Sequence, residues 1–332
     1  MVWSDTTVLS AILHCVPGEN FRQTLDIYTS QGAETTPVSV IIHGGGWNER
    51  DKDEVGLQPR LFNAAGIVED SVKYRMVLAV RHPDNPRDVA AAIAWIHRSV
   101  SKFGGNPHRL YLMGHSTGWH LAALVATDNR YLAAHNRHRR DLAGGICLDG
   151  SAFDIPDRIH NGVGQVVGNC QTAFGEDESV QRDGSPVTHV AADDPLLPFL
   201  LLYLEEERLN HRQSRLFAEL VRQSGGTTRL VHIAEDKTHP SLCDDVVAIH
   251  DSTGPLMVEF LLQREGWPVN RFVSTGHIPQ WFRMGCCELE ATPRKHRPIR
   301  RLCGLRAKKI LFLSATAVST RILGNDLEKC SR

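Results

Sequence analysis

A serine between two glycines, directly after a short apolar run, constrains this chain more than any other feature. The apolar run covers 110–112, and the motif Gly-His-Ser-Thr-Gly follows at 114–118. The pattern predicts a strand, a turn tight enough to require glycine at its flanks, and then a helix. Ser116, at the apex of such a turn, is held in a strained backbone conformation that projects its hydroxyl away from both elements. A nucleophile is presented in this way.

The segments on either side of Ser116 argue against a chance match in a glycine-containing loop. Residues 120–126 are apolar and rich in helix-forming types. Upstream, apolar residues recur at helical spacing between positions 89 and 100, and Gly104 stands where that helix would end. Helix, strand, serine turn and helix therefore form one parallel crossover unit.

Strand-like and helix-like runs alternate over most of the chain, which predicts an α/β fold with a mostly parallel sheet and helices on both faces. The expected strands are 24–28, 38–42, 110–113, 145–148, 199–204 and 229–233, and the expected helices are 57–65, 86–102, 120–126, 214–224 and 255–263. The alternation also requires a buried strand near 67–74, but Glu69 and Asp70 lie within it. We expect that strand to be short and frayed, or to carry its charged half at the end of the sheet.

The chain divides into a main domain, 1–264, and a basic tail, 265–332. Within the main domain, residues 154–194 are rich in Gly, Asp, Asn and Ser, and we interpret them as a partial cap over the site, with a disordered insertion as the alternative. Lysine and arginine gather between 292 and 309 without helical or strand periodicity. The tail is expected to be poorly ordered, with an interaction arm as the alternative.

Composition excludes several classes of partner. The formal net charge of −1 argues against nucleic acid and against an anionic membrane surface. The longest apolar stretch, 310–318, is about half of a membrane helix, and no basic segment precedes the apolar run at 8–13. Eight scattered cysteines then favour a reducing, cytoplasmic compartment. The 17 histidines form no metal-ligand array, so neither a metal nor another cofactor is expected.

Backbone donors for a developing oxyanion are predicted next to Ser116. The β-rich run 38–42 ends at His-Gly-Gly-Gly-Trp, 43–47, where successive glycines leave N–H groups uncovered by side chains. Gly44, Gly45 and the amide of Thr117 would complete an oxyanion hole. A merely flexible loop is the alternative.

A base and an orienting acid are expected later in the chain. His239 lies on a polar loop after the run 229–233, whereas His232 lies within that run and His250 lies near the last helix. We favour His239, because a catalytic base belongs on a loop held by a rigid scaffold. The acid should end the strand at 199–204, where the three carboxylates at 205–207, Glu205, Glu206 and Glu207, cannot be separated by spacing.

The motifs at 43–47, 114–118 and 237–239 together resemble the α/β-hydrolase superfamily, specifically its hormone-sensitive-lipase-like carboxylesterases and the kynurenine formamidases. The resemblance runs from about 20 to 263, with further matches at 20–28, 74–75, 82–83, 88–95 and 103–107. It implies that Ser116 is the nucleophile, His239 the base, and Gly44, Gly45 and Thr117 the oxyanion donors. Glu206 matches the acid by its offset from Gln213, although the family carries an aspartate.

The resemblance implies a serine hydrolase that cleaves a small ester or an N-formyl aryl amide through an acyl-enzyme. A non-catalytic ligand-binding protein on the same fold is the alternative. Trp47, Trp119, Phe153 and Phe174 are expected either to line an apolar substrate pocket or to belong to the core. Trp119 stands where the family usually has a small residue, so we expect it to narrow the pocket or to strain the start of its helix.

Overall fold

The computed structural model describes residues 7–12, 20–30, 32–192, 194–204, 208–233, 237–244, 246 and 251–263, and for 7–12 the backbone alone. All of them belong to one compact unit, Met1–Leu289. The predicted tail, 265–332, and the three carboxylates at 205–207 lie outside the described residues.

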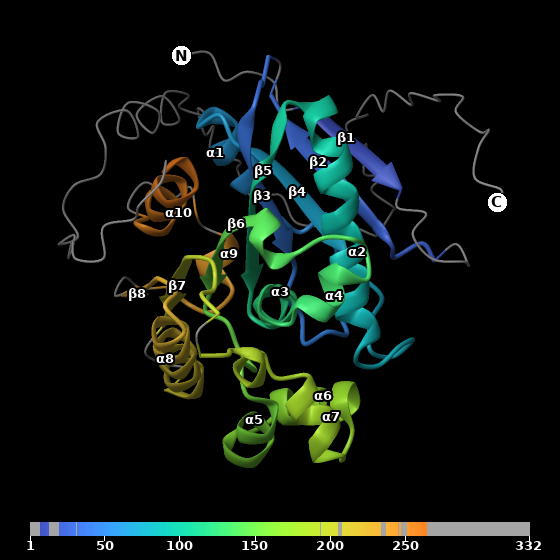
Figure 1. The fold of residues 1–332 in the computed structure, drawn as a ribbon, viewed down its shortest axis with the longest axis vertical. Helices are drawn as coiled ribbons and strands as arrows, with labels where there is room; N and C mark the ends of the chain where they lie inside the picture. The colour runs from blue at the N-terminus through green and yellow to red at the C-terminus, as the bar shows by residue number, and fades with distance from the viewer. Residues whose placement is uncertain are drawn as a thin grey trace, which may run out of the picture. The chain divides into compact units, whose positions relative to one another are not determined.

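Within the described residues, one eight-stranded sheet runs in the order β1-β2-β4-β3-β5-β6-β7-β8 (Figure 1). Its strands are β1 Thr7–Ile12, β2 Thr24–Thr29, β3 Thr36–Ile42, β4 Val68–Lys73, β5 Gly105–His115, β6 Leu142–Leu148, β7 Phe199–Tyr203 and β8 Thr228–His232. Strand β2 is antiparallel to β1 and β4, and the pairs from β4 to β8 are parallel. The predicted α/β architecture is confirmed.

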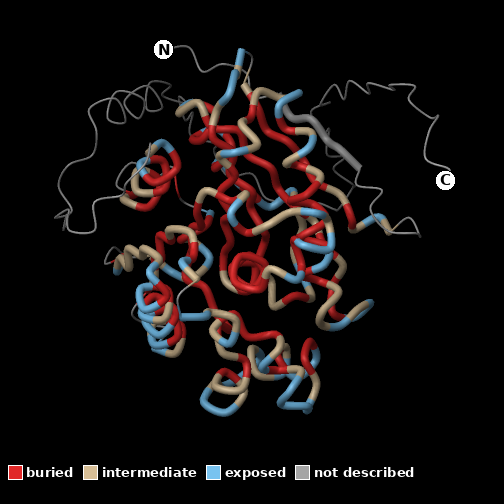
Figure 2. The backbone as a smooth tube through the Cα atoms, viewed as in Figure 1, coloured by how far each residue is buried: buried red, intermediate tan, exposed pale blue. Residues whose placement is uncertain are grey.

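Helices cover both faces of the sheet. The helices are α1 Gln58–Ala64, α2 Asp84–Ser99, α3 Thr117–Thr127, α4 Asn129–Ala133, α5 Ile155–Asn161, α6 Gln165–Phe174, α7 Glu178–Asp183, α8 Arg208–Gln223, α9 Ser241–Asp244 and α10 Thr253–Leu262, with short 3-10 turns η1 Val100–Phe103, η2 Arg139–Asp141 and η3 Pro186–His189. Side chains of α2, α3 and α8 pack on one face, and those of α1, α9 and α10 pack on the other. The central strands β2, β3, β4, β6 and β7 and the second half of β5 are largely buried between them (Figure 2). None of the helices that the structure describes is long and apolar enough to span a bilayer.

The fourth strand is regular although it carries two carboxylates. Glu69 and Asp70 lie in β4, between β2 and β3, and both are fully buried. Their side chains point to opposite faces of the sheet, because successive residues of a strand alternate. We expected this strand to be short and frayed, or to carry its charged half at the end of the sheet, and that expectation is wrong. Burial raises the pKa of both carboxyls well above the usual value, and the charge of Asp70 adds to the effect on Glu69.

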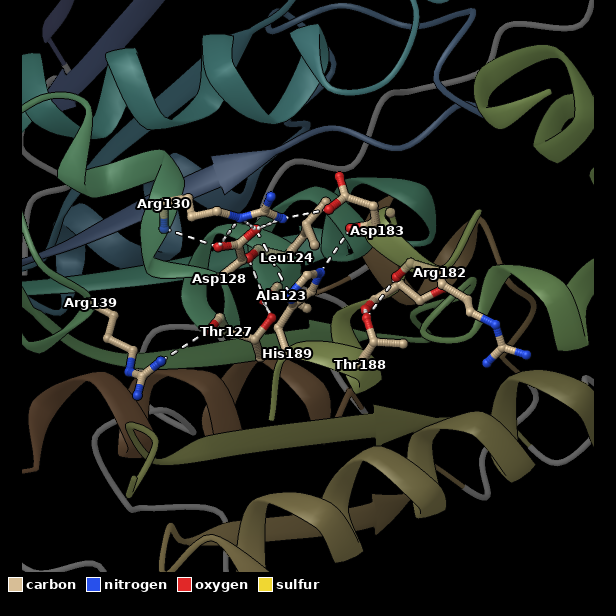
Figure 3. A network of polar contacts seen from close by, with 12 residues as sticks. Ala123, Leu124, Thr127, Asp128, Arg130, Arg139, Arg182, Asp183, Thr188 and His189 are labelled. Carbon is tan, nitrogen blue, oxygen red and sulfur yellow. Dashed lines mark hydrogen bonds and ion pairs between the residues drawn. The ribbon is translucent and has the colours of Figure 1, made fainter. Parts of the chain in front are cut away.

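The cap segment, which we define as residues 154–194, contributes α5, α6 and α7, which lie together beyond the sheet (Figure 1). Polar contacts hold its C-terminal part against α4 and the end of α3 (Figure 3). The Arg130 guanidinium donates to Asp128 and to Asp183, both at 2.6 Å. His189 Nε2 donates to the carbonyl of Asp183 at 2.8 Å. The segment is thus fixed to the helices that flank the central strands.

Removing either buried carboxylate should stabilise the protein at neutral pH. The folded state retains protons that the unfolded chain releases above its ordinary carboxyl pKa of about 4, so these groups lower the unfolding free energy as pH rises beyond that value. Glu69→Gln and Asp70→Asn should each raise it by about 1–2 kcal/mol at pH 7 and by little near pH 4. Urea unfolding at several pH values measures this, with the exposed Glu34→Gln as the control. A gain independent of pH would contradict the assignment.

Candidate active site

Ser116 occupies a strained turn between β5 and α3. Its backbone angles are φ 55° and ψ −123°, a combination that residues with a Cβ rarely adopt. The amide of Ser116 donates to the carbonyl of Leu148 at 3.0 Å, and this bond ties the turn to the end of β6. Ser116 is half-buried, whereas His115 and Thr117 on either side are buried. The sequence prediction of strand, tight turn and helix matches this geometry.

The two glycines of the motif allow the turn to pack. A Cβ on Gly118 would collide with the carbonyl oxygens of Ile42 and His43 at the end of β3, and one on Gly114 would collide with the amide of Trp119. No side chain fits at either position without moving backbone. The start of α3 therefore lies directly against the segment that follows β3.

That segment is the glycine loop, which we define as residues 43–47. A Cβ on Gly44 would lie 2.8 Å from the carbonyl oxygen of His115 and 3.2 Å from the Cβ of Ser116, so the loop runs beside the serine. Gly45, Gly46 and Trp47 have successive positive φ angles of 93°, 59° and 62°. Glycine adopts such angles at no steric cost, whereas Trp47 adopts them against the preference of a residue with a Cβ.

The side chain of Tyr74, which follows β4, contacts the glycine loop through its hydroxyl and its ring. Its hydroxyl donates to the carbonyl of His43 at 3.1 Å and lies 3.4 Å from that of Gly44. Its ring stacks on the ring of His43 with centroids 4.4 Å apart. Burial lowers the pKa of His43 to about 4, so this imidazole stays neutral, and its Nδ1 donates to the Gly44 carbonyl at 3.0 Å. Sequence reasoning noted Tyr74 as a motif match but assigned it no role.

His239 forms a hydrogen bond with a carboxylate on the loop after β6. Its Nδ1 lies 2.6 Å from Asp149 Oδ2, and about a third of its side chain is exposed while Asp149 is fully buried. The amide of Leu204 donates to Asp149 Oδ1 at 3.3 Å, and Asn210 Nδ2 lies 3.4 Å from Oδ2. Because a carboxylate only accepts, Nδ1 carries a proton and donates it to Asp149. Asp149 therefore fixes the orientation of the His239 ring.

The acid beside His239 differs from the one that the sequence favoured. Glu206 was expected to orient the base, and it lies outside the described residues. Nδ1 has a single proton to donate, and Asp149 accepts it from the end of β6, one strand before the predicted position. The available signal was an aspartate directly after the strand predicted at 145–148, at the edge where α/β sheets carry their sites.

His115, the residue before the serine, also contacts the base. Its Nε2 donates to the carbonyl of His239 at 2.8 Å, and the two rings lie 4.4 Å apart between centroids. Burial, and then the charge of His239, lower the pKa of His115 to about 3. His115 is therefore a neutral donor that holds the His239 loop against the serine turn. Of the other candidates, His232 is exposed at the end of β8 and His250 lies outside the described residues.

The four aromatic residues suggested for a substrate pocket are buried in the core. Trp47, Trp119, Phe153 and Phe174 are at most 5% exposed and belong to one apolar cluster. The rings of Trp47 and Phe174 pack edge to face, with centroids 5.4 Å apart. The core interpretation therefore describes them better than an open pocket wall.

The indole of Trp119 occupies space that two glycines leave free, and the start of its helix is regular. Its ring lies edge-on to Phe199 of β7 and Phe217 of α8. A Cβ on Gly145 would lie 2.9 Å from the indole, and one on Gly150 would collide with it. Helix α3 begins regularly at Thr117. The expectation that Trp119 would either narrow the pocket or strain the helix start finds no support in these contacts.

No metal-binding group is evident among the residues that the structure describes. Clusters of three or more His, Cys, Asp or Glu side chains that could hold an ion do not occur there. Cys147, Cys170 and Cys243 are free and buried.

Comparisons with known proteins find esterases among the proteins that this chain resembles. The BD-FAE family model matches residues 25–144. The probable carboxylic ester hydrolase LipM of Mycobacterium tuberculosis is 28% identical over 57% of this chain and 46% of its own length. A probable isoprenylcysteine alpha-carbonyl methylesterase of Oryza sativa subsp. japonica is 32% identical over 68% of this chain and 56% of its own. The chain thus spans about half the length of the curated relatives that it matches.

Solved structures share the fold. Thermogutta terrifontis esterase 2, phosphoramylated by tabun, superposes with a TM-score of 0.62 at 21% identity, covering 77% of this chain and 94% of that one. Esterase B of Lactobacillus rhamnosis superposes with a TM-score of 0.58 at 20% identity, covering 70% and 76%. The chain has the α/β-hydrolase fold of these esterases. The fold that the motif resemblance implied is confirmed, and the serine turn follows the expected strand.

The strain at Ser116 predicts a gain in stability when the serine is replaced by glycine. Ser116→Gly relieves the unfavourable φ, whereas Ser116→Ala keeps a Cβ there, and both remove the hydroxyl. Ser116→Gly should exceed Ser116→Ala in unfolding free energy by about 1–2 kcal/mol, measured by urea unfolding. Equal stability of the two variants would show that the turn is unstrained.

Proposed function

We propose that this α/β-hydrolase is a serine hydrolase that cleaves small carboxylic esters through an acyl-enzyme intermediate. One observation carries the proposal: a strained serine, a histidine paired with a buried carboxylate, and a glycine loop converge at one edge of the sheet. Acyl transfer needs a nucleophile, a base, an orienting acid and oxyanion donors, and the proposal assigns these roles to this group of residues.

In the proposed reaction, Ser116 Oγ attacks the ester carbonyl carbon and its proton passes to Nε2 of His239. The carbonyl electron pair moves onto oxygen, which the backbone N–H groups of Gly44, Gly45 and Thr117 stabilise. Thr117 is the first residue of α3, so its amide has no carbonyl partner within the helix. Collapse of the intermediate expels the alcohol, which takes the proton from His239. Water then repeats the sequence on the acyl-enzyme and releases the acid.

Asp149 is proposed as the orienting acid in place of Glu206. It fixes the tautomer of His239 and stabilises the imidazolium that forms when the base takes a proton. Its own position is fixed by two further donors, from Leu204 and Asn210, so the carboxylate needs no contact with solvent.

The substrate class is proposed from the relatives. Their names are those of carboxylic ester hydrolases and methylesterases, and one solved esterase of the same fold was obtained with butyrate bound. A short acyl group is therefore the leading candidate. An N-formyl aryl amide is the second, because the glycine and serine motifs also resemble those of kynurenine formamidases. The cytoplasmic location stays a prediction.

Labelling and turnover test the proposed function. A fluorophosphonate probe should label wild-type protein and leave Ser116→Ala unlabelled. A series of p-nitrophenyl esters should be hydrolysed with preference for short acyl chains, and comparison with N-formylkynurenine separates the two substrate classes. Absence of labelling and turnover, together with ligand binding that survives Ser116→Ala, would favour the non-catalytic alternative.

The identity of the acid is tested by two amide substitutions. Asp149→Asn leaves the shape but favours the wrong tautomer of His239, and should lower kcat by roughly 10²–10⁴-fold. Glu206→Gln should leave kcat within about threefold of wild type, because the proposal assigns the orientation of His239 to Asp149 and gives Glu206 no part in it. Steady-state kinetics on one ester decides between them. A larger loss for Glu206→Gln would restore the sequence assignment.

A further inference from the structure

His120 lies on α3 one turn after Ser116 and is fully buried. Both of its ring nitrogens are engaged. Trp47 Nε1 donates to His120 Nδ1 at 3.2 Å, and Nε2 of the same ring lies 2.7 Å from the carbonyl of Gly184. Because an indole can only donate and a carbonyl can only accept, His120 is the neutral tautomer protonated at Nε2. One imidazole thus links the glycine loop to the cap segment.

The protein keeps this imidazole neutral. Burial lowers the pKa of His120 to about 3, although the bond to Gly184 acts in the opposite direction. The ring of His120 also packs edge to face against Trp47 and Phe174, with centroids 5.2 and 5.5 Å away. Its orientation is therefore determined by two hydrogen bonds and two aromatic contacts.

Trp47 is the residue of the glycine loop that most needs such support. It has a φ of 62° although it carries a bulky side chain, and such a conformation persists only where the surroundings determine it. Its carbonyl accepts the amide of Val77 at 3.0 Å, and its indole N–H is bound by His120. Trp47 directly follows the glycines, so the bonds that fix Trp47 also restrain the C-terminal end of the glycine loop.

The Gly184 end of the link through His120 is also fixed. Gly184 follows Asp183, whose carboxylate accepts from Arg130 at 2.6 Å (Figure 3). The same carboxylate also accepts from His82 Nε2 at 2.9 Å. The carbonyl of Asp183 accepts from His189. The Gly184 carbonyl is therefore presented by a part of the cap segment that is held on both sides.

A second contact joins the cap segment to the same loop. Asn48 Nδ2 donates to Asn169 Oδ1 of α6 at 3.2 Å, and Asn169 Nδ2 occupies the place where a Cβ on Gly46 would project. The cap segment thus meets the glycine loop through α6 as well as through Gly184.

We propose that His120 is a positioning residue that holds the glycine loop in its oxyanion-binding conformation through Trp47, with its ring and tautomer fixed by Gly184 of the cap segment. The inference rests on the proposed function, because it assigns the purpose of the link to a hole that accepts negative charge. The acceptor at Nδ1 is the part of His120 on which the loop depends.

Two amide substitutions separate the functions of the two ring nitrogens. Asparagine places its amide near the position of Nδ1, so His120→Asn keeps an acceptor for Trp47 and loses the bond to Gly184. Glutamine reaches the position of Nε2, so His120→Gln keeps a donor to Gly184 and loses the acceptor for Trp47. Both remove the aromatic ring, so each is the matched control of the other.

The readouts are kcat, KM and inhibition by a trifluoromethyl ketone that resembles the preferred ester. Ser116 Oγ adds to the ketone carbon, its proton passes to His239, and the resulting oxyanion requires the same donors as the reaction. His120→Gln should lower kcat by roughly 10–100-fold and raise the ketone inhibition constant by a similar factor, with KM little changed. His120→Asn should keep both values within about fivefold of wild type.

An activity-independent readout keeps the proposal testable if the chain hydrolyses no ester. The chain has six tryptophans, and Trp47→Phe identifies the indole N–H signal of Trp47 in a ¹⁵N–¹H spectrum. That signal should be retained, with slow hydrogen exchange, in wild type and His120→Asn, and should shift and exchange faster in His120→Gln. Equal losses in the two variants, or an unchanged Trp47 signal in His120→Gln, would overturn the positioning role. Failure of the wild type to turn over esters or bind the ketone would overturn the proposed function instead.

Discussion

The site depends on the close packing of the start of α3 against the end of β3. Gly118 lies so near the carbonyls of Ile42 and His43 that no side chain fits between them. This approach places the serine turn and the glycine loop in one rigid body, because each is continuous with one of the two packed backbones. Backbone contact is stiffer than contact through side chains, and geometry within fractions of an ångström is what acyl transfer needs.

Local pattern was sufficient for most of the fold and for the serine, the histidine and the glycine loop. Apolar periodicity predicted the strands and helices of the central unit, and glycine spacing predicted the turn at Ser116. These features are encoded by neighbours in sequence. Helix α8 was placed only in part, since it begins at Arg208 rather than at 214 and its first turn carries no apolar residue pattern of its own.

The features that were not predicted depend on contacts between segments distant in sequence. Asp149 and His239 are 90 residues apart in the chain, and the fold brings them together. The position of Asp149 after β6 made it a candidate, but local pattern could not pair it with His239. The full burial of Glu69 and Asp70 contradicts the apolar pattern of central strands, and only the strand order places them inside. Propensity reports the local preference of the chain, whereas tertiary packing decides the outcome at such positions.

Trp119 is a large residue directly after the Gly-His-Ser-Thr-Gly motif, and the surrounding glycines leave space for its indole. Its indole fills the volume that side chains at Gly145 and Gly150 would otherwise take, so the three positions share one fixed space. The sizes of the side chains at these positions are therefore coupled. A smaller residue in place of Trp119 would remove the indole contact at each glycine, but a Cβ at Gly145 would still meet Phe199 and one at Gly150 would still meet Cys147. Substitutions within this group should therefore be non-additive in stability, because each is accommodated only when its neighbours also move.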